Sequence, residues 1–384
     1  MDTALVDVVL IIVVGLVFDF TNGFHDSANA IAAPVVTKAV PPRVAALGAA
    51  ILNVIGAFAS LEVAKTVGSG IVDSGAVTPA TVLVGLVAAV AWNMGSWRFG
   101  LPTSSSFALI GGLMGAAVVQ SGFGVLNGQN FVDKVLIPAF SSPAIGFAIA
   151  ALLVLAMVGP VTRWMTRRRQ ASRGIMIVTS MFVAYSHGAN DAQKTMGIIG
   201  LALVAGGFYA EFTVPVWVIL LCALAMGIGT YVGGWRIVET LGKKIVRLDM
   251  QSGIAVQAST AGVLYSTAML GFPVSTTQVV TGAVLGSGSR DRWRLTNWGV
   301  MGRIVVAWVV TIPATMLVAA ALEALNRAPG GDIMLYIVLA IGAVAFVIVA
   351  RPLFVSYEEE EAVEPELEAR GELPREAPVR PGGA

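Results

Sequence analysis

The heptapeptide Gly23-Phe-His-Asp-Ser-Ala-Asn29 has a partial copy later in the chain, Gly188-Ala-Asn-Asp-Ala-Gln-Lys194. Both copies hold an aspartate at the fourth position, Asp26 and Asp191, in surroundings that are otherwise apolar. A charged residue is rare in such a stretch and needs a partner or a function. The recurrence therefore predicts a chain built from two related halves, with one aspartate from each half in a shared site.

A second pair of stretches repeats in the same order. Gly100-Leu-Pro-Thr-Ser-Ser-Ser106 matches Gly271-Phe-Pro-Val-Ser-Thr-Thr277, and two glycines of each half continue the match. Between the motifs, Lys65-Thr-Val-Gly68 pairs more loosely with Glu239-Thr-Leu-Gly242. Gly-Pro-Ser clusters can simply mark loops, but clusters that recur in the same order across two halves favour a true repeat. The glycines are Gly111 and Gly115, which match Gly282 and Gly286.

Composition indicates the solvent of this chain. Of its 384 residues 56% are hydrophobic and only 12% are charged, and the mean hydropathy is +0.81. Roughly a quarter of the residues of a soluble domain are charged. The composition therefore predicts an all-α polytopic membrane protein. The single cysteine, Cys222, excludes a disulfide framework and a thiolate metal site.

Apolar runs follow one another along the chain and predict about ten to twelve membrane segments. Several runs are short or interrupted by Gly, Pro, Ser and Asn, which predicts broken or re-entrant helices; residues 174–206 are expected to form one broken crossing. The runs are Leu5–Phe20, Val44–Leu61, Pro79–Trp97, Thr103–Val119, Leu136–Val161, Gly174–Ser186, Thr195–Gly206, Val214–Trp235, Gly253–Leu270, Val274–Leu285, Trp298–Leu325 and Ile333–Val355.

A basic segment separates the two halves and orients the chain. Five arginines lie between Arg163 and Arg173, and the positive-inside rule assigns them to the cytoplasm. A nucleic-acid patch is a poor alternative in a short loop between two spans. Five crossings before this loop place the N-terminus outside, and the second half then starts from the opposite side, so the two repeats would be inverted in the membrane.

These considerations divide the chain into four parts. Residues 1–161 form the first repeat, 162–173 a basic cytoplasmic linker, and 174–356 the second repeat. Residues 357–384 contain nine Glu and three Arg, and we expect them to be a disordered acidic tail in the cytoplasm. The N-terminus carries Asp2 and Asp7 instead of Lys or Arg, so we expect no cleaved signal peptide.

The repeated motifs suggest binding chemistry. The carboxylates of Asp26 and Asp191, with the amides of Asn29 and Asn190, supply oxygens for a small cation and acceptors for a protonated oxyanion. Asn22 adds a further amide, and Asp19 either joins the set or has a structural role. Inverted repeats with interrupted helices are typical of secondary transporters that bind substrate near the midplane.

The hydroxyl-rich motifs are typical of helix starts. Ser104, Ser105 and Ser106, like Ser275, Thr276 and Thr277, follow a Gly-x-Pro and precede an apolar run. A helix N-terminus presents unpaired N–H groups and partial positive charge, so it binds anions without Lys or Arg. A single motif of this kind would be ordinary capping. Two at matched positions predict a site for a tetrahedral oxyanion.

The paired motifs resemble those of the PiT inorganic phosphate transporters, whose signature is a twice-repeated Gly-Ala-Asn-Asp-Val-Ala-Asn. The resemblance extends to about Val355. It implies symport of phosphate with protons or sodium, with the phosphate held between the signatures and the hydroxyl-rich helix starts. By motif matching, the resemblance assigns the role of signature residues to Asp26, Asn29, Asn190 and Asp191. It assigns the hydroxyl groups around the phosphate to Ser104, Ser105, Ser275, Thr276 and Thr277.

The chain departs from that signature where a coupling ion would act. His25 replaces an Asn of the first copy, Gln193 replaces a small residue, and Lys194 replaces the last Asn of the second copy. We assign His25, Asp26, Asp191 and Lys194 to the coupling ion, because an ammonium could replace a sodium ion and histidine titrates near neutral pH. Lys194 could also attract phosphate directly or extend to the membrane interface. Bacterial members with these variants, which this chain resembles, are proton-coupled and often carry a neutral complex of phosphate with a divalent metal.

Other functions fit less well. A sulfate or thiosulfate permease shares the pattern, but a carboxylate that must accept a proton from the substrate would reject sulfate. An intramembrane aspartyl protease would need a Gly before each aspartate, and no P-loop or Cys/His metal cluster suggests an enzyme. We therefore expect no enzyme activity, no resident cofactor or metal and no nucleic acid. The expected location is the inner (plasma) membrane, and a homodimer stays open.

Overall fold

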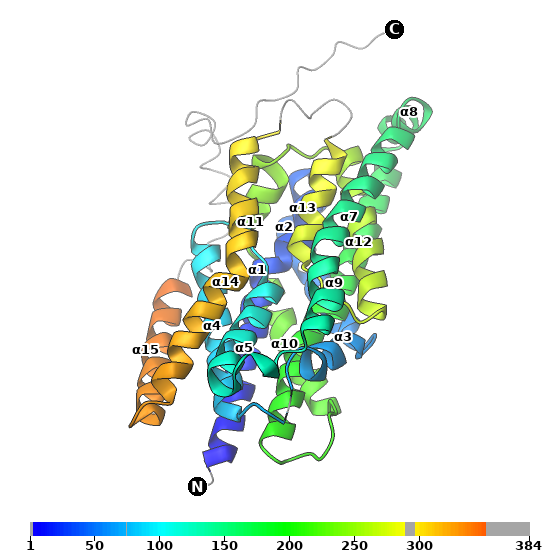
Figure 1. Ribbon diagram of the computed structural model, residues 1–384. Coiled ribbons are helices and arrows are strands. Elements are labelled where there is room, and N and C mark those ends of the chain that lie inside the picture. Colours follow the sequence, from blue (N-terminus) through cyan, green and yellow to red (C-terminus); the bar gives the residue numbers. More distant parts are fainter. Residues whose placement is uncertain (1–2, 74, 289–295, 351–384) are drawn as a thin grey trace.

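The computed structural model describes residues 3–73, 75–288 and 296–350. Among them the chain is almost entirely helical, with no strand and one isolated bridge between Val72 and Leu126. Most helices run along one axis and pack into a bundle (Figure 1). The all-α prediction is confirmed. The helices are α1 (Thr3–Val36), α2 (Pro42–Gly56), α3 (Glu62–Lys65), η1 (Thr66–Gly70), α4 (Pro79–Arg98), α5 (Ser105–Ser121), η2 (Phe123–Val125), α6 (Gly128–Asn130), η3 (Phe131–Leu136), α7 (Ile137–Ala156), α8 (Pro160–Arg167), α9 (Arg169–Ala205), α10 (Val216–Val232), α11 (Trp235–Glu239), η4 (Thr240–Lys244), α12 (Met250–Met269), α13 (Thr276–Ser287), α14 (Trp298–Asn326) and α15 (Gly331–Ala350).

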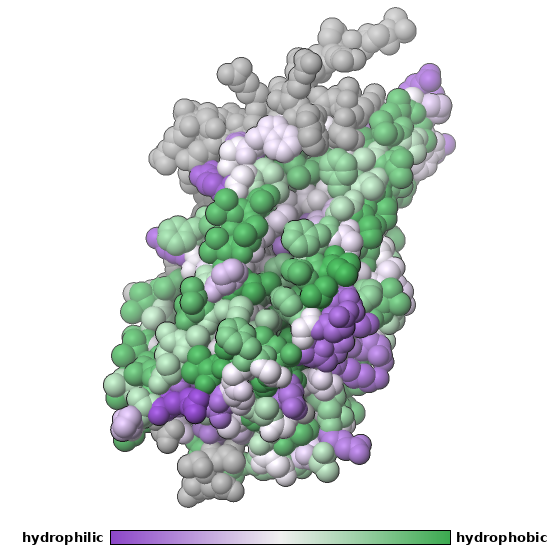
Figure 2. Space-filling view, viewed as in Figure 1, coloured by the Kyte–Doolittle hydropathy of each residue, from purple (hydrophilic) through white to green (hydrophobic). Residues whose placement is uncertain are grey.

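The bundle has the apolar exterior of a multi-pass membrane protein. Five of its helical stretches are long and apolar enough to cross a bilayer: α1, α4, α6 to α7, α14 and α15. The pair formed by α10 and α11–η4 passes the same test together, with a bend of 65° between its parts. Apolar side chains cover most of the visible face (Figure 2), and Ile341 and Val344 of α15 are more than 60% exposed. The larger count of ten to twelve segments stays a prediction.

The two helices that carry the heptapeptide copies are continuous, so the expected break at residues 174–206 is wrong. α1 runs without interruption through Gly23, and α9 runs for 37 residues through Gly188. The glycines serve close packing instead. A Cβ on Gly23 would lie 2.3 Å from the carbonyl oxygen of Met226 in α10, and one on Gly188 would lie 2.1 Å from that of Asn53 in α2. Each motif helix therefore packs tightly against a helix of the other half.

Further pairs of elements also match between the halves. α5 packs along α14, and its sequence counterpart α13 packs along α7. The loosely matched stretches both form π-helical turns, η1 after α3 and η4 after α11. A Cβ on Gly111 would lie 2.8 Å from the Ile312 oxygen, and one on Gly282 would lie 2.3 Å from the Pro143 oxygen. These matched contacts agree with two related halves. Their inversion relative to a bilayer stays a prediction.

The basic linker is helical and not a loop. Residues 160–167 form α8, and α9 begins at Arg169, so only Arg168 lies between the two helices. Proline at the first position and the absence of glycine after Gly159 explain why α8 forms here. α8 stands out at one end of the bundle (Figure 1). The acidic tail at 357–384 lies outside the described residues.

Candidate functional site

Polar side chains form a ladder between α1 and α9 in the interior of the bundle. Thr195 Oγ1 donates to Asp19 Oδ1 at 2.5 Å, and Asn22 Nδ2 donates to Asp191 Oδ2 at 3.3 Å. One turn further, His187 Nε2 lies 3.9 Å from Asp26 Oδ2. Residue numbers rise along α1 as they fall along α9, so the two helices are antiparallel. The repeat thereby brings its two aspartates into one site.

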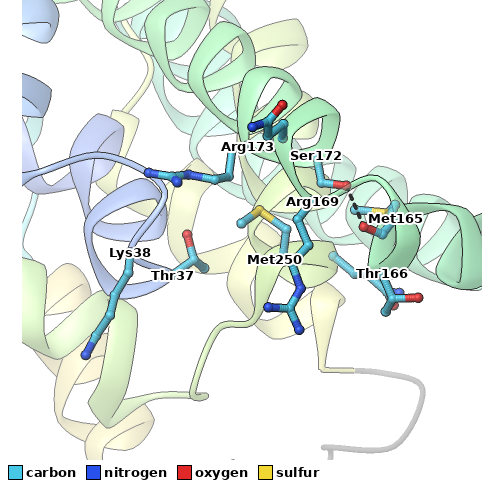
Figure 3. Close-up of a pocket in the computed structure, with 10 residues that line it drawn as sticks. Thr37, Lys38, Met165, Thr166, Arg169, Ser172, Arg173 and Met250 are labelled. Atoms are coloured by element: carbon cyan, nitrogen blue, oxygen red, sulfur yellow. Dashed lines mark hydrogen bonds between the residues drawn. The ribbon is translucent and has the colours of Figure 1, made fainter.

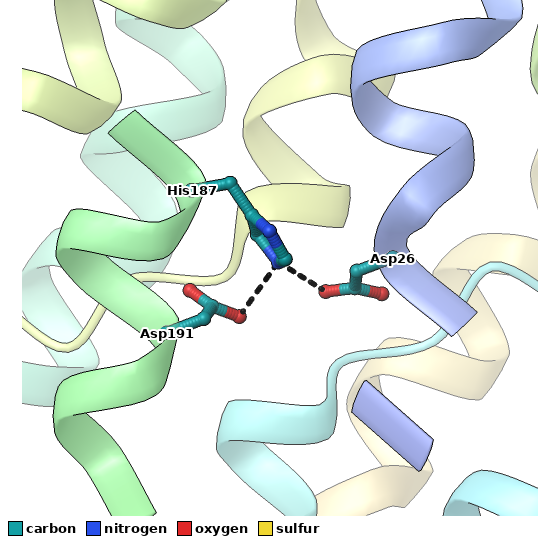
Figure 4. Close-up of side chains that lie close together, drawn as sticks. All are labelled: Asp26, His187 and Asp191. Carbon is teal, nitrogen blue, oxygen red and sulfur yellow. Dashed lines mark ion pairs between the residues drawn. The ribbon is translucent and has the colours of Figure 1, made fainter. Parts of the chain in front are cut away.

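Asp26 lies between two histidines. His25 Nδ1 is 2.7 Å from Asp26 Oδ1, and His187 Nε2 faces Asp26 Oδ2 at 3.9 Å and Asp191 Oδ2 at 3.5 Å. All four side chains are 3% exposed or less. Figure 4 shows the His187 ring directed between the two carboxylates. One donor atom from each of Asp26, His187 and Asp191 lies within 4.8 Å of the others, so these atoms could surround a single small cation.

The protonation of His187 is constrained by its other nitrogen. Asn53 uses its amide nitrogen to donate to Thr230 Oγ1 at 2.7 Å, which turns its oxygen toward His187. That oxygen lies 2.9 Å from His187 Nδ1, so Nδ1 carries a proton. Without a second proton, Nε2 would present a lone pair to two carboxylates. A proton or another cation in this gap removes the repulsion.

Lys194 joins three separate elements. Its ammonium, 1% exposed, donates to Asp191 Oδ1 at 2.7 Å, to Ser106 Oγ of α5 at 2.5 Å and to the Val274 carbonyl before α13 at 2.9 Å. An ammonium has three donors, and all three are satisfied. Lys194 is therefore fixed in place as a permanent counter-ion to Asp191, and it does not extend to the membrane interface.

The two hydroxyl-rich motifs do begin helices, as predicted. Ser104 Oγ accepts from the Phe107 amide at the start of α5, and Ser275 Oγ accepts from the Gln278 amide at the start of α13. These two hydroxyls serve as N-caps. The next residues of α13 face the carboxylates: Thr276 Oγ1 donates to Asp191 Oδ1 and Thr277 Oγ1 donates to Asp26 Oδ1, each at 3.1 Å.

Several buried polar atoms of the predicted residues have no partner within the part of the chain that the structure describes. They are Ser105 Oγ, Asn29 Oδ1 and Asn190 Oδ1, together with Asn22 Oδ1 from the ladder. The side-chain nitrogens of two of these asparagines do have partners: Asn29 donates to Thr277 Oγ1 at 3.3 Å, and Asn190 donates to the Phe272 carbonyl at 3.2 Å. Buried polar groups normally have partners. Several buried oxygen atoms without a partner in one place are typical of a site that binds a polar ligand.

The sequence prediction left four contributors outside the site. His187, one of the chain's two histidines, lies beside the second signature copy, where a structural hydrogen bond was an equally good interpretation, but it faces both aspartates. Ser106, quoted in its motif but not assigned to the site, binds Lys194; its place in the repeated hydroxyl triplet was the available signal. Asn53 orients His187, and a lone amide in an apolar helix was a weak signal for it. Gln193 accepts from the amides of Val63 and Ala64 at 3.0 and 3.3 Å, so it fastens α3 to α9.

Comparison with known proteins identifies a family. The phosphate transporter family matches residues 22–319. A probable low-affinity inorganic phosphate transporter of Mycobacterium tuberculosis is 43% identical over 334 residues, which cover 84% of this chain and 78% of the relative. A Bacillus subtilis protein described in the same words is 39% identical, over 83% of this chain and 97% of its own. The solved structure of a sodium-dependent phosphate transporter superposes with a TM-score of 0.73 at 25% identity, over 83% of this chain and 98% of that one.

Proposed function

Because the chain belongs to the phosphate transporter family, we propose that it is a symporter that carries inorganic phosphate across the membrane with protons. One observation carries this proposal. The carboxylates of Asp26 and Asp191 accept from hydroxyls at the start of α13 on either side of His187, whose Nε2 faces both of them. Lys194 links Asp191 to Ser106 at the start of α5. An oxyanion site and a cation site thus share the same side chains.

The substrate would bind between the helix starts and the carboxylates. The first N–H groups of α5 and α13 have no intrahelical partner, and they attract an anion together with the Ser105 hydroxyl. Thr276 and Thr277 can turn their hydroxyls from the carboxylates to phosphate oxygens. Asp26 would then accept a hydrogen bond from the P–OH group of the substrate. Sulfate, which carries no proton near neutral pH, would meet this carboxylate with a bare oxygen and be rejected.

Proton coupling follows from the unequal surroundings of the two aspartates. Asp191 has a permanent partner in Lys194, whose ammonium occupies a place where a sodium ion would otherwise balance the charge. Asp26 has no such fixed cation among the described residues: its neighbours are the imidazoles of His25 and His187 and the Thr277 hydroxyl. A releasable positive charge in the site is therefore a proton on His187 or Asp26. Sodium coupling is the alternative, and it describes the solved relative.

Uptake into proteoliposomes tests the proposal. With no sodium present and an imposed inward proton gradient, we expect labelled phosphate to accumulate, and a protonophore should abolish accumulation. Excess sulfate should not compete. Accumulation that requires sodium, or equal competition by sulfate, would overturn proton coupling or phosphate selectivity respectively. His187→Gln, which keeps an amide donor toward Asn53, should lose gradient-driven uptake while the protein stays folded.

Transport of phosphate as a neutral complex with a divalent metal is a second candidate. The close approach of donor atoms from Asp26, His187 and Asp191 favours it, because such a cluster accommodates a cation carried as cargo. Uptake measured with and without Mg²⁺, and co-uptake of a labelled divalent ion, distinguishes this candidate from free phosphate.

We also propose the inner (plasma) membrane as the location, with the N-terminus outside and the C-terminal tail in the cytoplasm. The arginines of α8 and of the start of α9 support this orientation by the positive-inside rule. Labelling of single cysteines at the two ends of α9 from either side of the membrane, in a Cys222→Ala background, tests it.

A further inference from the structure

A basic cavity of about 410 Å³ lies where α9 begins (Figure 3). Four elements line it: the segment after α1, the end of α8, the first turns of α9 and the start of α12. Three of the lining residues are cations, Lys38, Arg169 and Arg173, and none is an acid. The cavity is therefore a place of concentrated positive charge with the volume of a small-molecule pocket.

The cavity belongs to the membrane interface and not to the transport pathway. Along α9, Arg169 precedes Asp191 by 22 residues, which is about 33 Å at the rise of an α-helix. The surface of the hydrocarbon core is only about 15 Å from the midplane, so a cavity this far from a site near the midplane lies outside the core. Beside the cavity, Trp164 of α8 is 45% exposed, and Val161, one turn away from the cavity-lining Met165, is 40% exposed. Charged groups above exposed apolar and Trp side chains are typical of the headgroup region.

The cations are held in place but are not neutralised. Arg173 donates from Nε and Nη2 to the Ala39 carbonyl at 3.3 and 3.1 Å, which fixes the segment after α1 against α9. Lys38 adopts a φ of 55°, a left-handed conformation that non-glycine residues rarely adopt. Neither Lys38 nor Arg169 forms an ion pair within the described residues. Asp249, which caps α12 next to the cavity, already accepts from the Ser252 amide and hydroxyl at 2.9 and 2.7 Å.

We propose that this cavity binds the phosphate headgroup of an anionic phospholipid. Lys38 and Arg169 supply uncompensated charge, and the remaining donors of Arg173 supply directed hydrogen bonds to phosphate oxygens. The thioethers of Met165 and Met250 line the cavity and contact the glycerol region, while the exposed side chains of α8 receive an acyl chain. The combination of a cationic cavity and adjoining exposed apolar surface selects a lipid over a free anion.

Native mass spectrometry of the full-length protein tests this inference independently of transport. The protein is titrated with phosphatidylglycerol and phosphatidylcholine of equal chain length. The variant Lys38→Gln/Arg169→Gln removes two cations from the cavity. Arg163→Gln/Arg167→Gln removes two from the exposed face of α8 outside it and serves as the matched control. Both pairs are surface-exposed, so folding should be retained, and thermal unfolding in detergent verifies it.

We expect one phosphatidylglycerol to bind in preference to phosphatidylcholine. Each cation near the surface contributes roughly fivefold in affinity, so the cavity variant should lose about thirtyfold, and the control should change less than threefold. Equal losses in both variants would mean general surface attraction and overturn the proposal. So would displacement of the lipid by millimolar inorganic phosphate, which indicates a free-anion site. Binding that appears only after deletion of residues 357–384 would assign the cavity to the acidic tail instead.

Discussion

Replacement of Lys194 tests the electrostatics of the site directly. Its buried ammonium makes three hydrogen bonds, to Asp191, Ser106 and Val274, at 2.5 to 2.9 Å. Lys194→Met keeps most of the side-chain volume and removes all three bonds. Removing one partner of a buried ion pair costs about 3–5 kcal/mol, mostly because the other charge is left uncompensated. We therefore expect the free energy of unfolding to fall by about that amount.

The magnitude depends on what Asp191 retains. Its remaining donors are the Thr276 hydroxyl at 3.1 Å and the Asn22 amide at 3.3 Å, with His187 Nε2 at 3.5 Å. These contacts are longer than the lost one at 2.7 Å and, except for a protonated His187, carry no charge. Because of these contacts, we expect the loss in free energy of unfolding to lie at the low end of the range, at about 3 kcal/mol.

A double-variant cycle isolates the pair. Unfolding is measured in mixed micelles for Lys194→Met, Asp191→Asn and the combination. Asp191→Asn removes the charge that Lys194→Met leaves uncompensated. We therefore expect the combined variant to lose about 2 kcal/mol less free energy of unfolding than the two single losses add up to. Additive losses, or a Lys194→Met protein as stable as the wild type, would refute the assignment of Lys194 as a fixed counter-ion.

The same position tests the choice of coupling ion. Lys194→Asn restores the residue that Asn29 supplies in the first copy and opens space beside Asp191. We expect this variant to be stabilised by sodium at millimolar concentration, whereas the wild type should be indifferent to sodium relative to choline at equal ionic strength. Sodium stabilisation of the wild type would show that the ammonium does not replace the ion.

Three further variants test packing, coupling and substrate binding. Gly188→Ala should prevent folding or lower the free energy of unfolding by several kcal/mol, since its Cβ would lie 2.1 Å from the backbone oxygen of Asn53. Gly174→Ala in the same helix meets no neighbouring atom and should raise the free energy of unfolding by up to about 1 kcal/mol. Unfolding in micelles compares the two variants. Asp26→Asn should keep the fold but lower proton-driven phosphate uptake at least about a hundredfold, and near-normal uptake would remove Asp26 from coupling. Ser105→Ala removes a buried hydroxyl that has no partner among the described residues, so stability should change by less than about 1 kcal/mol while the KM for phosphate rises; an unchanged KM would place the substrate elsewhere.

The sequence predicted which side chains gather at the candidate site better than it predicted the helices around them. Asp26 and Asp191 were identifiable because a carboxylate in an apolar run is unusual, and the hydroxyl motifs because Gly-x-Pro before Ser or Thr is a helix-start signal. The structure confirms both helix starts and brings both aspartates together. The use of these residues by phosphate itself stays a prediction.

The error at α9 has a physical explanation. Polar residues and glycine lower helix propensity, so Gly188 and its neighbours appeared to break the helix. In the fold, the polar groups find partners on α1 and α2, and the glycine is needed for the contact with Asn53. Local sequence cannot show this, because the compensating contacts come from residues more than a hundred positions away. The lone Asn53 was missed for the same reason.

The departures from the repeat explain more about the coupling ion than the repeat itself does. In an exact two-fold copy, Asp26 and Asp191 would have equivalent partners and bind the same cation. Here Asn29 corresponds to Lys194, and Asn22 corresponds to His187, so Asp191 has a fixed ammonium while the His187 imidazole lies between the two carboxylates. A transporter must release its cation on the far side, and an ammonium on a side chain cannot leave. Under the proposed proton coupling, the fixed charge would lower the number of cations that must move with each phosphate, and His187 would carry the one that does. If this is correct, exchanging Asn29 and Lys194 between the two copies should move the fixed charge to Asp26 and abolish gradient-driven uptake while leaving phosphate exchange at zero gradient intact. Loss of both activities together would refute the separation of fixed and releasable charge.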